Sequence, residues 1–257
     1  MSEIRFDDRV AVITGAGGGL GRTYALEFAR RGAKVVVNDL GSSTDGKGAS
    51  SSMADQVVKE ITEAGGTAVA NYDSVATPEG GEGIIKTALD NFGQVDIVVN
   101  NAGILRDKSF VKLSREELEL VLAMKERSYG RFVHTSSAAG IFGNFGQTNY
   151  GAAKRGMVGL SNVLAVEGAK NNIKSNVIAP IARTRMTEDL LGPLAEHVKP
   201  ECVTPLVVYL CSEQCQETHS IYSVGGGRFA RIFIGMAKGW FAGTGATPSA
   251  EEIAAHW

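Results

Sequence analysis

The sequence predicts an α/β fold in which helices cover both faces of a doubly wound parallel sheet of about seven strands. Short β-branched runs alternate along the chain with longer segments of helical periodicity. Strands and helices that alternate in this way form βαβ units and therefore a parallel sheet. At 257 residues and 44% hydrophobic composition, the chain is long enough for one large core, so we expect a single domain.

The individual elements follow from local composition. The expected strands are the β-branched runs Val10–Thr14, Lys34–Asn38, Thr67–Tyr72, Asp96–Asn100, Arg131–Thr135, Lys174–Ala179 and Ser220–Val224. The expected helices lie between them, near Gly19–Arg31, Ala54–Ala64, Glu82–Phe92, Ser114–Met124, Tyr150–Lys170 and Val203–Cys211. After Val224 the pattern loosens into an extension with one short helix expected near Ser249–Ala255.

Composition and charge exclude several classes of partner. The chain has 26 Lys and Arg against 28 Asp and Glu and no basic run, which argues against nucleic acid. Its apolar runs are far shorter than the ~20 residues of a membrane span, and we expect a cytoplasmic protein. The three cysteines form no CxxC pair and have no histidine beside them, so we expect reduced thiols and no metal site.

A glycine-rich turn joins the first expected strand to the first expected helix. It reads Thr-Gly-Ala-Gly-Gly-Gly-Leu-Gly over residues 14–21. Glycines allow a tight turn and close approach to a diphosphate, whose charge the helix N-terminus favours. No Lys-Ser/Thr pair follows, which excludes a P-loop. The turn predicts a dinucleotide site, and a purely structural turn is the alternative.

Asp39 ends the second expected strand, 20 residues after Gly19. A carboxylate at this place can accept hydrogen bonds from both ribose hydroxyls and would repel a 2′-phosphate. The residue before Gly19 is Gly18, so no basic side chain there attracts such a phosphate. NAD is therefore preferred over NADP, unless Asp39 only caps a turn.

Tyr150 and Lys154 are four residues apart at the start of an expected helix, so they share one face. A phenol is too weak an acid for efficient proton transfer at neutral pH, and a neighbouring ammonium stabilises its phenolate. Ser137 ends a strand upstream, at the sheet edge where parallel α/β folds bind ligands. These three side chains are the candidate catalytic residues.

The chain resembles the short-chain dehydrogenase/reductase family over roughly residues 5–225. The shared motifs, in order, are the glycine turn, Asn-Asn-Ala-Gly at 100–103, Ser137, Tyr-x-x-x-Lys at 150–154 and Asn-Val-Ile-Ala-Pro at 176–180. This resemblance implies a single Rossmann-type domain, usually assembled as a homodimer or homotetramer. It also implies that Tyr150 is the general acid/base, that Ser137 orients the substrate oxygen, and that Lys154 binds the nicotinamide ribose.

The resemblance further implies which residues contact NAD. They surround the diphosphate, the adenosine, the underside of the cofactor and the nicotinamide. In chain order they are Gly15, Gly17, Gly19, Leu20, Gly21, Asp39, Asp73, Ser74, Val75, Asn100, Asn101, Ala102, Gly103, Tyr150, Lys154, Pro180, Ile181, Ala182 and Thr184. Ile181 departs from the pattern, because many relatives have Gly or Asn after the proline.

A closer resemblance is to the (3R)-hydroxyacyl-CoA dehydrogenase unit of the peroxisomal multifunctional β-oxidation enzyme and its bacterial relatives. The shared stretches are VVVNDLG (35–41), NYDSV (71–75), NNAGILRDKSF (100–110) and GNFGQTNY (143–150). It implies hydride transfer between NAD and C3 of a (3R)-3-hydroxyacyl-CoA. Two alternatives stay open: another secondary alcohol, such as a sterol or an acyl-carrier-protein thioester, and a catalytically silent NAD-binding protein.

One segment departs strongly from the family. Between Gly103 and Ser137 the chain is about sixteen residues shorter than the family pattern, which corresponds to about 24 Å of helix. We expect its loss to uncover one sheet face and to unseat the strand before Ser137. We therefore expect that the natural chain carries a segment between Met124 and Lys125 that the printed sequence omits. A fourth catalytic residue, often an Asn on this helix, stays unassigned.

The remaining predictions concern the division of the chain, the apolar stretch near its C-terminus and His134. We expect residues 1–225 to form the dinucleotide-binding and catalytic domain and residues 226–257 an extension packed on that domain or on a partner subunit. The apolar stretch Phe229–Phe241 would line an acyl tunnel or, as we favour, a subunit interface. His134 is interpreted as a neutral, hydrogen-bonded histidine of the sheet, because Tyr150 already supplies the acid/base.

Overall fold

The computed structural model describes residues 3–41, 52–102, 124–184, 187 and 191–256. Its sheet has the strand order β3-β2-β1-β4-β5-β6-β7-β8, in which only β8 is antiparallel to its neighbour. The strands are β1 Val10–Thr14, β2 Lys34–Asn38, β3 Thr67–Asn71, β4 Ile97–Asn100, β5 Gly130–Thr135, β6 Ile173–Pro180, β7 Ser220–Gly225 and β8 Arg228–Ile232. The predicted doubly wound parallel sheet is therefore confirmed, with one strand more than expected.

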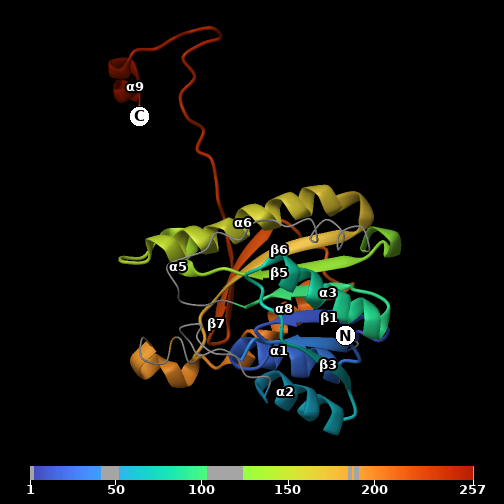
Figure 1. The fold of residues 1–257 in the computed structure, drawn as a ribbon. Coiled ribbons are helices and arrows are strands. Elements are labelled where there is room, and N and C mark those ends of the chain that lie inside the picture. Colours follow the sequence, from blue (N-terminus) through green and yellow to red (C-terminus); the bar gives the residue numbers. More distant parts are fainter. Residues whose placement is uncertain (1–2, 42–51, 103–123, 185–186, 188–190, 257) are drawn as a thin grey trace.

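Helices cover both faces of this sheet (Figure 1). The helices are α1 Gly19–Arg30, α2 Ser52–Glu63, α3 Pro78–Phe92, α5 Ala138–Phe142, α6 Thr148–Gly168, α8 Thr204–Cys211 and α9 Ala250–His256. Short 3-10 turns span Ala169–Asn171, Gly192–His197 and Pro200–Cys202. The expected helix Ser114–Met124 lies outside the described residues except for Met124, which begins a short helical stretch of residues 124–127.

Alternation along the strands divides the core into two layers. In β1, Ala11 and Ile13 face the cluster formed with α1, α2 and α8, whereas Val10 and Val12 face the cluster formed with α3 and α6. Successive strand residues point to opposite faces. Because both faces are covered, all five residues of β1 are buried. This central strand anchors the glycine turn that follows it.

A residue with a positive φ angle, in the left-handed region of backbone conformation, precedes each parallel strand. Glycine occupies this position before β2, β3 and β4, and non-glycine residues occupy it before the other four strands: Asp8, Ser128, Asn172 and His219. Left-handed residues commonly end helices and reverse the chain. These turns all lie at the amino-terminal edge of the sheet. The candidate site lies at the opposite edge of the sheet, where the parallel strands have their carboxyl ends.

The strand before Ser137 stays in the sheet despite the shortened segment, so our expectation that it is unseated is wrong. β5 pairs in register with β4 on one side and β6 on the other, and all six of its residues are buried. Met124 is fully buried and packs in the cluster with Phe132, Leu164 and Ile173. The helical residues retained before β5 therefore cover this part of the sheet face.

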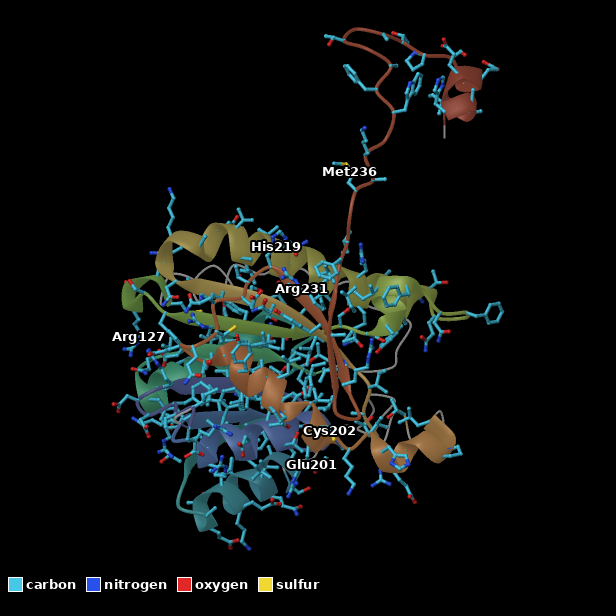
Figure 2. The ribbon with its side chains drawn as sticks, turned by 180° about the vertical axis from the view of Figure 1, so that it is seen from behind. Arg127, Glu201, Cys202, His219, Arg231 and Met236 are labelled. Atoms are coloured by element: carbon cyan, nitrogen blue, oxygen red, sulfur yellow. The ribbon has the colours of Figure 1, made fainter. Side chains whose placement is uncertain are left out.

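The C-terminal residues begin in the sheet and then leave it. β8 extends the sheet as an antiparallel edge strand, and Figure 1 shows the following chain standing away from the body up to α9. Met236, labelled on this arm in Figure 2, is 98% exposed. Within the arm, the Trp240 and His256 rings stack 4.1 Å apart. The assignment of residues 226–257 as a packed extension stays a prediction.

Candidate active site

The glycine turn lies at the carboxyl end of β1 and opens α1. Gly15 and Gly19 have positive φ angles of 65° and 52°. A Cβ atom at Gly21 would lie 2.1 Å from the Gly15 carbonyl oxygen, so this position requires glycine. The residue before the helix, Gly18, supplies no side-chain cap. Among the described residues no side chain caps this end of α1, so its first N–H groups can bind an anion, as a diphosphate site requires.

Asp39 lies beside this turn. Its Oδ2 accepts the Gly17 N–H at 2.8 Å, and its Oδ1 accepts the Gly41 N–H at 2.7 Å. A Cβ atom at Gly17 would come within 2.9 Å of the Asp39 carboxylate. The glycine thus lets the carboxylate approach the turn from the end of β2. This position is the one from which an acidic side chain meets an adenosine ribose.

A polar network holds the loop after β3. The Asn38 amide donates to Asn71 Oδ1 at 2.8 Å and to the Asp73 carbonyl at 2.9 Å. Asn71 in turn donates to Asp73 Oδ2 at 2.7 Å. These bonds place Asp73, Ser74 and Val75 at the carboxyl edge, beyond Asp39, and Val75 is 45% exposed.

The chain after β4 is fastened to the glycine turn. Thr14 Oγ1 accepts the backbone N–H groups of Asn101 and Ala102 at 3.1 and 3.0 Å. The Asn101 amide donates to the Thr14 and Gly15 carbonyls at 3.0 and 3.2 Å. Sequence reasoning did not assign this role to Thr14. Gly103, the last residue of the predicted motif, lies outside the described residues.

Ser137 begins α5 at the end of β5. Its Oγ accepts the Ala139 N–H at 3.3 Å as the helix N-cap, which leaves its own O–H free to donate to another group. Helix α5 lies directly against α6. A Cβ atom at Gly140 would be 2.7 Å from Lys154 Cβ, and one at Gly151 would be 3.2 Å from the Ala139 carbonyl. The two glycines thus bring the serine helix close to the tyrosine–lysine helix.

Tyr150 and Lys154 lie one turn apart near the start of α6, as predicted. Lys154 Nζ donates to the Thr135 carbonyl at 2.8 Å and lies 5.8 Å from the centre of the Tyr150 ring. Burial lowers the pKa of Lys154 to about 8. The amine is thus held beside the phenol by the last residue of β5.

The remaining candidate residues follow β6. The Ile181 N–H donates to the Val224 carbonyl at 2.8 Å, and its side chain is 47% exposed. Ala182 is buried. A Cβ atom at Gly19 would lie 3.6 Å from Thr184 Cγ2, so the loop after Pro180 reaches back to the glycine turn. The structure thus brings the segments after β1, β4 and β6 together.

His134 is fully buried in β5, as expected for a histidine of the sheet. Its Nδ1 lies 3.2 Å from the Asn100 amide nitrogen and its Nε2 3.1 Å from Ser175 Oγ, which is 2.9 Å from Ser161 Oγ. Because the amide nitrogen is a donor, these contacts fit a neutral ring that donates from Nε2. Burial lowers the pKa of His134 to about 4, so the ring is neutral at pH 7.

Other parts of the molecule offer weaker candidates. A cavity of about 380 Å³ lies at the amino-terminal edge, near Arg9 and Tyr129. Arg9 pairs there with Asp96 at 3.2 Å and also with Glu213, so this charge is already neutralised. Within the described ranges, no group of His, Cys, Asp or Glu could hold a metal. Among the helices described, none is long and apolar enough to cross a bilayer.

Comparison with known proteins identifies the family. The family model for short chain dehydrogenases matches residues 9–124 and 118–192. The chain is 55% identical to a short-chain type dehydrogenase/reductase of Mycobacterium tuberculosis, over 97% of this chain and 93% of that protein. The chain therefore belongs to the short-chain dehydrogenase family, and the predicted oxidoreductase class is confirmed.

A second relative points to a narrower group. Peroxisomal multifunctional enzyme type 2 of Mus musculus is 54% identical over 90% of this chain, which spans only 33% of the mouse protein. That alignment is 248 positions long but includes only 90% of the 257 residues of this chain. About 17 of its positions are therefore residues of the mouse protein that face a gap in this chain. The two family-model matches meet at residues 118–124. Both findings agree with the shortened segment noted in the sequence.

Solved structures agree with the fold. A short chain dehydrogenase from Mycobacterium avium superimposes with a TM-score of 0.77 at 39% identity, covering 96% of this chain and 92% of that one. A 7α-hydroxysteroid dehydrogenase solved with NADH and 7-oxo glycochenodeoxycholic acid gives 0.73 at 27% identity, with 87% and 95% covered.

Proposed function

We propose that the chain transfers hydride between NAD and C3 of a (3R)-3-hydroxyacyl-CoA. One observation carries this proposal: α5, which Ser137 caps, lies in close contact with α6, which carries Tyr150 and Lys154. This contact lies at the carboxyl edge of the sheet, where the glycine turn also opens. The edge therefore combines an acid/base with a dinucleotide cradle.

The residues at this edge fit NAD. The free N–H groups of α1 suit the diphosphate, and the Asp39 carboxylate suits ribose hydroxyls and disfavours a 2′-phosphate. Lys154 has protons left for the nicotinamide ribose after its bond to Thr135. The related hydroxysteroid dehydrogenase was solved with NADH. When bound, the nicotinamide supplies the hydride acceptor in the oxidising direction.

The chain's own residues handle the proton. Ser137 donates its O–H to the substrate oxygen and so orients the carbinol. The Tyr150 phenolate takes the hydroxyl proton as the C3–H bond breaks, which leaves a ketone. The Lys154 ammonium stabilises the phenolate before this step, and in the reverse direction Tyr150 returns the proton.

The assignment of a CoA thioester as the substrate is supported by the relatives of the chain. The mouse, Dictyostelium and yeast relatives are peroxisomal multifunctional or hydratase-dehydrogenase-epimerase enzymes at 51–54% identity, each much longer than this chain. A bacterial 3-oxoacyl-[acyl-carrier-protein] reductase, at 36% identity, favours the alternative of a carrier-protein thioester. Steroids as substrates are favoured by the hydroxysteroid enzyme, at the lower identity of 27%.

The substrate assignment is tested by comparing matched alcohols. We expect NAD reduction with (3R)-3-hydroxyacyl-CoA, little with the (3S) isomer, and much slower turnover of the free 3-hydroxy acid. Carrier-protein thioesters and hydroxysteroids serve as competing substrates in the same assay. Equal rates with the free acid, or faster turnover of a competing substrate, would contradict the CoA assignment.

The shortened segment favours a second candidate, a protein that binds NAD without catalysis. Intact mass spectrometry and NADH titration distinguish the two. A chain of 27.1 kDa that binds NADH but oxidises none of these alcohols would support the silent protein. Turnover by a chain of that mass would reject it.

We also propose a homodimer or homotetramer. The arm after β8 exposes Phe233, Met236 and Phe241, and in the described structure it stands away from its own domain. Large exposed apolar surfaces commonly become protein interfaces. Light scattering on the full chain tests this, and a monomer would contradict it.

A further inference from the structure

We propose that Ser136 is a positioning residue for the reaction: its buried hydroxyl fixes the helical turn that carries Lys154. The proposal rests on the function proposed above. It concerns the serine that precedes the candidate catalytic Ser137, to which sequence reasoning gave no role.

Two adjacent residues of the chain leaving β5 hold Lys154 at both of its ends. Ser136 Oγ donates to the Lys154 backbone carbonyl at 2.7 Å. In return, Lys154 Nζ donates to the Thr135 carbonyl at 2.8 Å. Ser136 is 2% exposed, so water does not replace this bond readily. The backbone and the ammonium of one residue are thus fixed by neighbouring groups.

This arrangement sets the relation between the two catalytic helices. Ser137 follows Ser136 directly and begins α5, while Tyr150 lies one turn before Lys154 on α6. The lack of a side chain at Gly140 permits the close approach of α5 to Lys154. A bond from Ser136 to α6 therefore couples the position of the serine hydroxyl to that of the phenol and the amine.

The hydrogen bond from Ser136 matters chemically because of the groups that surround Lys154. Among the described residues no carboxylate forms an ion pair with Lys154, and α5 (Ala-Ala-Gly-Ile-Phe) has no titratable side chain. Tyr150 faces the amine from its own helix, and Thr135 presents a carbonyl from β5. Position therefore determines how strongly the ammonium acts on the phenol, because charge interactions weaken with distance.

The test compares three variants of the full chain. Ser136→Ala removes the bond, and Ser136→Thr keeps a hydroxyl. Ser212→Ala is the matched control, because Ser212 is equally buried and donates to a backbone carbonyl, that of Tyr209 at 2.8 Å, in α8. Thermal unfolding of each variant shows whether it folds and reports any purely structural loss.

Two readouts need no turnover. In Ser136→Ala we expect NADH to bind about five- to tenfold more weakly, because a displaced Lys154 loses one hydrogen bond to the nicotinamide ribose. We also expect acetic anhydride to acylate Lys154 about threefold faster, relative to the exposed Lys170, because a less firmly held turn of α6 exposes the buried amine more often. Ser136→Thr and Ser212→Ala should match the parent in both.

Turnover supplies the third readout. At saturating NAD, we expect kcat of Ser136→Ala to fall about tenfold with little change in the KM of the alcohol, and the half-maximal pH of kcat to move upward, because a displaced ammonium stabilises the phenolate less. The Thr variant should restore both values. Parental NADH affinity, Lys154 reactivity and pH profile in a folded Ser136→Ala protein would overturn the proposal.

The experiments distinguish a failure of the proposed function from a failure of the role proposed for Ser136. If the parent chain oxidises no alcohol, the proposed function fails, while NADH affinity and Lys154 acylation still test the role of Ser136. If the parent is active and Ser136→Ala equals it in every readout, only the positioning role fails.

Discussion

Substituting Gly140 with alanine tests how closely α5 must approach α6. The added Cβ would lie 2.7 Å from Lys154 Cβ, 2.8 Å from the Lys154 carbonyl carbon and 3.0 Å from the Arg155 nitrogen. Two of these three atoms are backbone, so no side-chain rotation removes the overlap. Reaching ordinary contact at about 3.4 Å requires α5 to move by at least ~0.7 Å relative to α6.

The consequences for catalysis and stability differ in size. A displacement of about 1 Å in a catalytic constellation costs roughly 100-fold in rate, so we expect kcat to fall about 30- to 100-fold. Overpacking costs about 1–3 kcal/mol, and the better helix propensity of alanine returns up to about 1 kcal/mol. The net loss of about 1 kcal/mol lowers Tm by only about 2–4 °C for a chain of this size.

Steady-state kinetics and thermal unfolding measure both effects. Gly159→Ala is the matched control on α6, because a Cβ atom there meets nothing within 4 Å. We expect this control to gain about 0.5–1 kcal/mol of stability and to keep its kcat. Activity of Gly140→Ala within threefold of the parent would refute the reasoning, and so would a loss fully explained by unfolded protein.

Three further predictions concern other parts of the chain. The fully buried Tyr24 hydroxyl has no partner in the described structure, so Tyr24→Phe should stabilise the protein by about 1 kcal/mol; a lower Tm would contradict this. Asp39→Asn keeps an acceptor for the Gly17 N–H but removes the charge, so the kcat/KM preference for NAD over NADP should fall about tenfold; an unchanged preference would exclude a charge effect. The pKa of His134 is about 4 when folded and about 6.5 when unfolded, so the unfolded chain binds more protons between these values. Stability should therefore drop by up to about 3 kcal/mol as pH falls from 6.5 to 4 in urea titrations, and equal slopes for the parent and His134→Gln would contradict this assignment.

The sequence was sufficient to predict the seven parallel strands because each of them has a strong local signal. The first two expected strands match β1 and β2 residue for residue, and the other five differ by one residue at one or both ends. β8 was missed because RFARI carries two arginines and follows a run of glycines, features that disfavour a strand. Its pairing depends on β7 rather than on its own composition.

The site was predictable in its residues but not in its supports. Motif spacing located Ser137, Tyr150 and Lys154, and in the structure Ser137 caps α5 while Tyr150 and Lys154 lie on the adjoining α6. The five residues of α5 are too few for a helical periodicity, so its contact with α6 had no local signal. The bond from Ser136 to Lys154 joins residues 18 positions apart and exists only in the tertiary structure.

Replacing Tyr150 by phenylalanine tests the central claim most directly. The substitution removes one oxygen and leaves the ring beside Lys154. We expect kcat with (3R)-3-hydroxyacyl-CoA to fall by about 10²–10⁴-fold while the NADH dissociation constant stays within about threefold of the parent. Turnover close to that of the parent chain would show that another group moves the proton and would contradict the account.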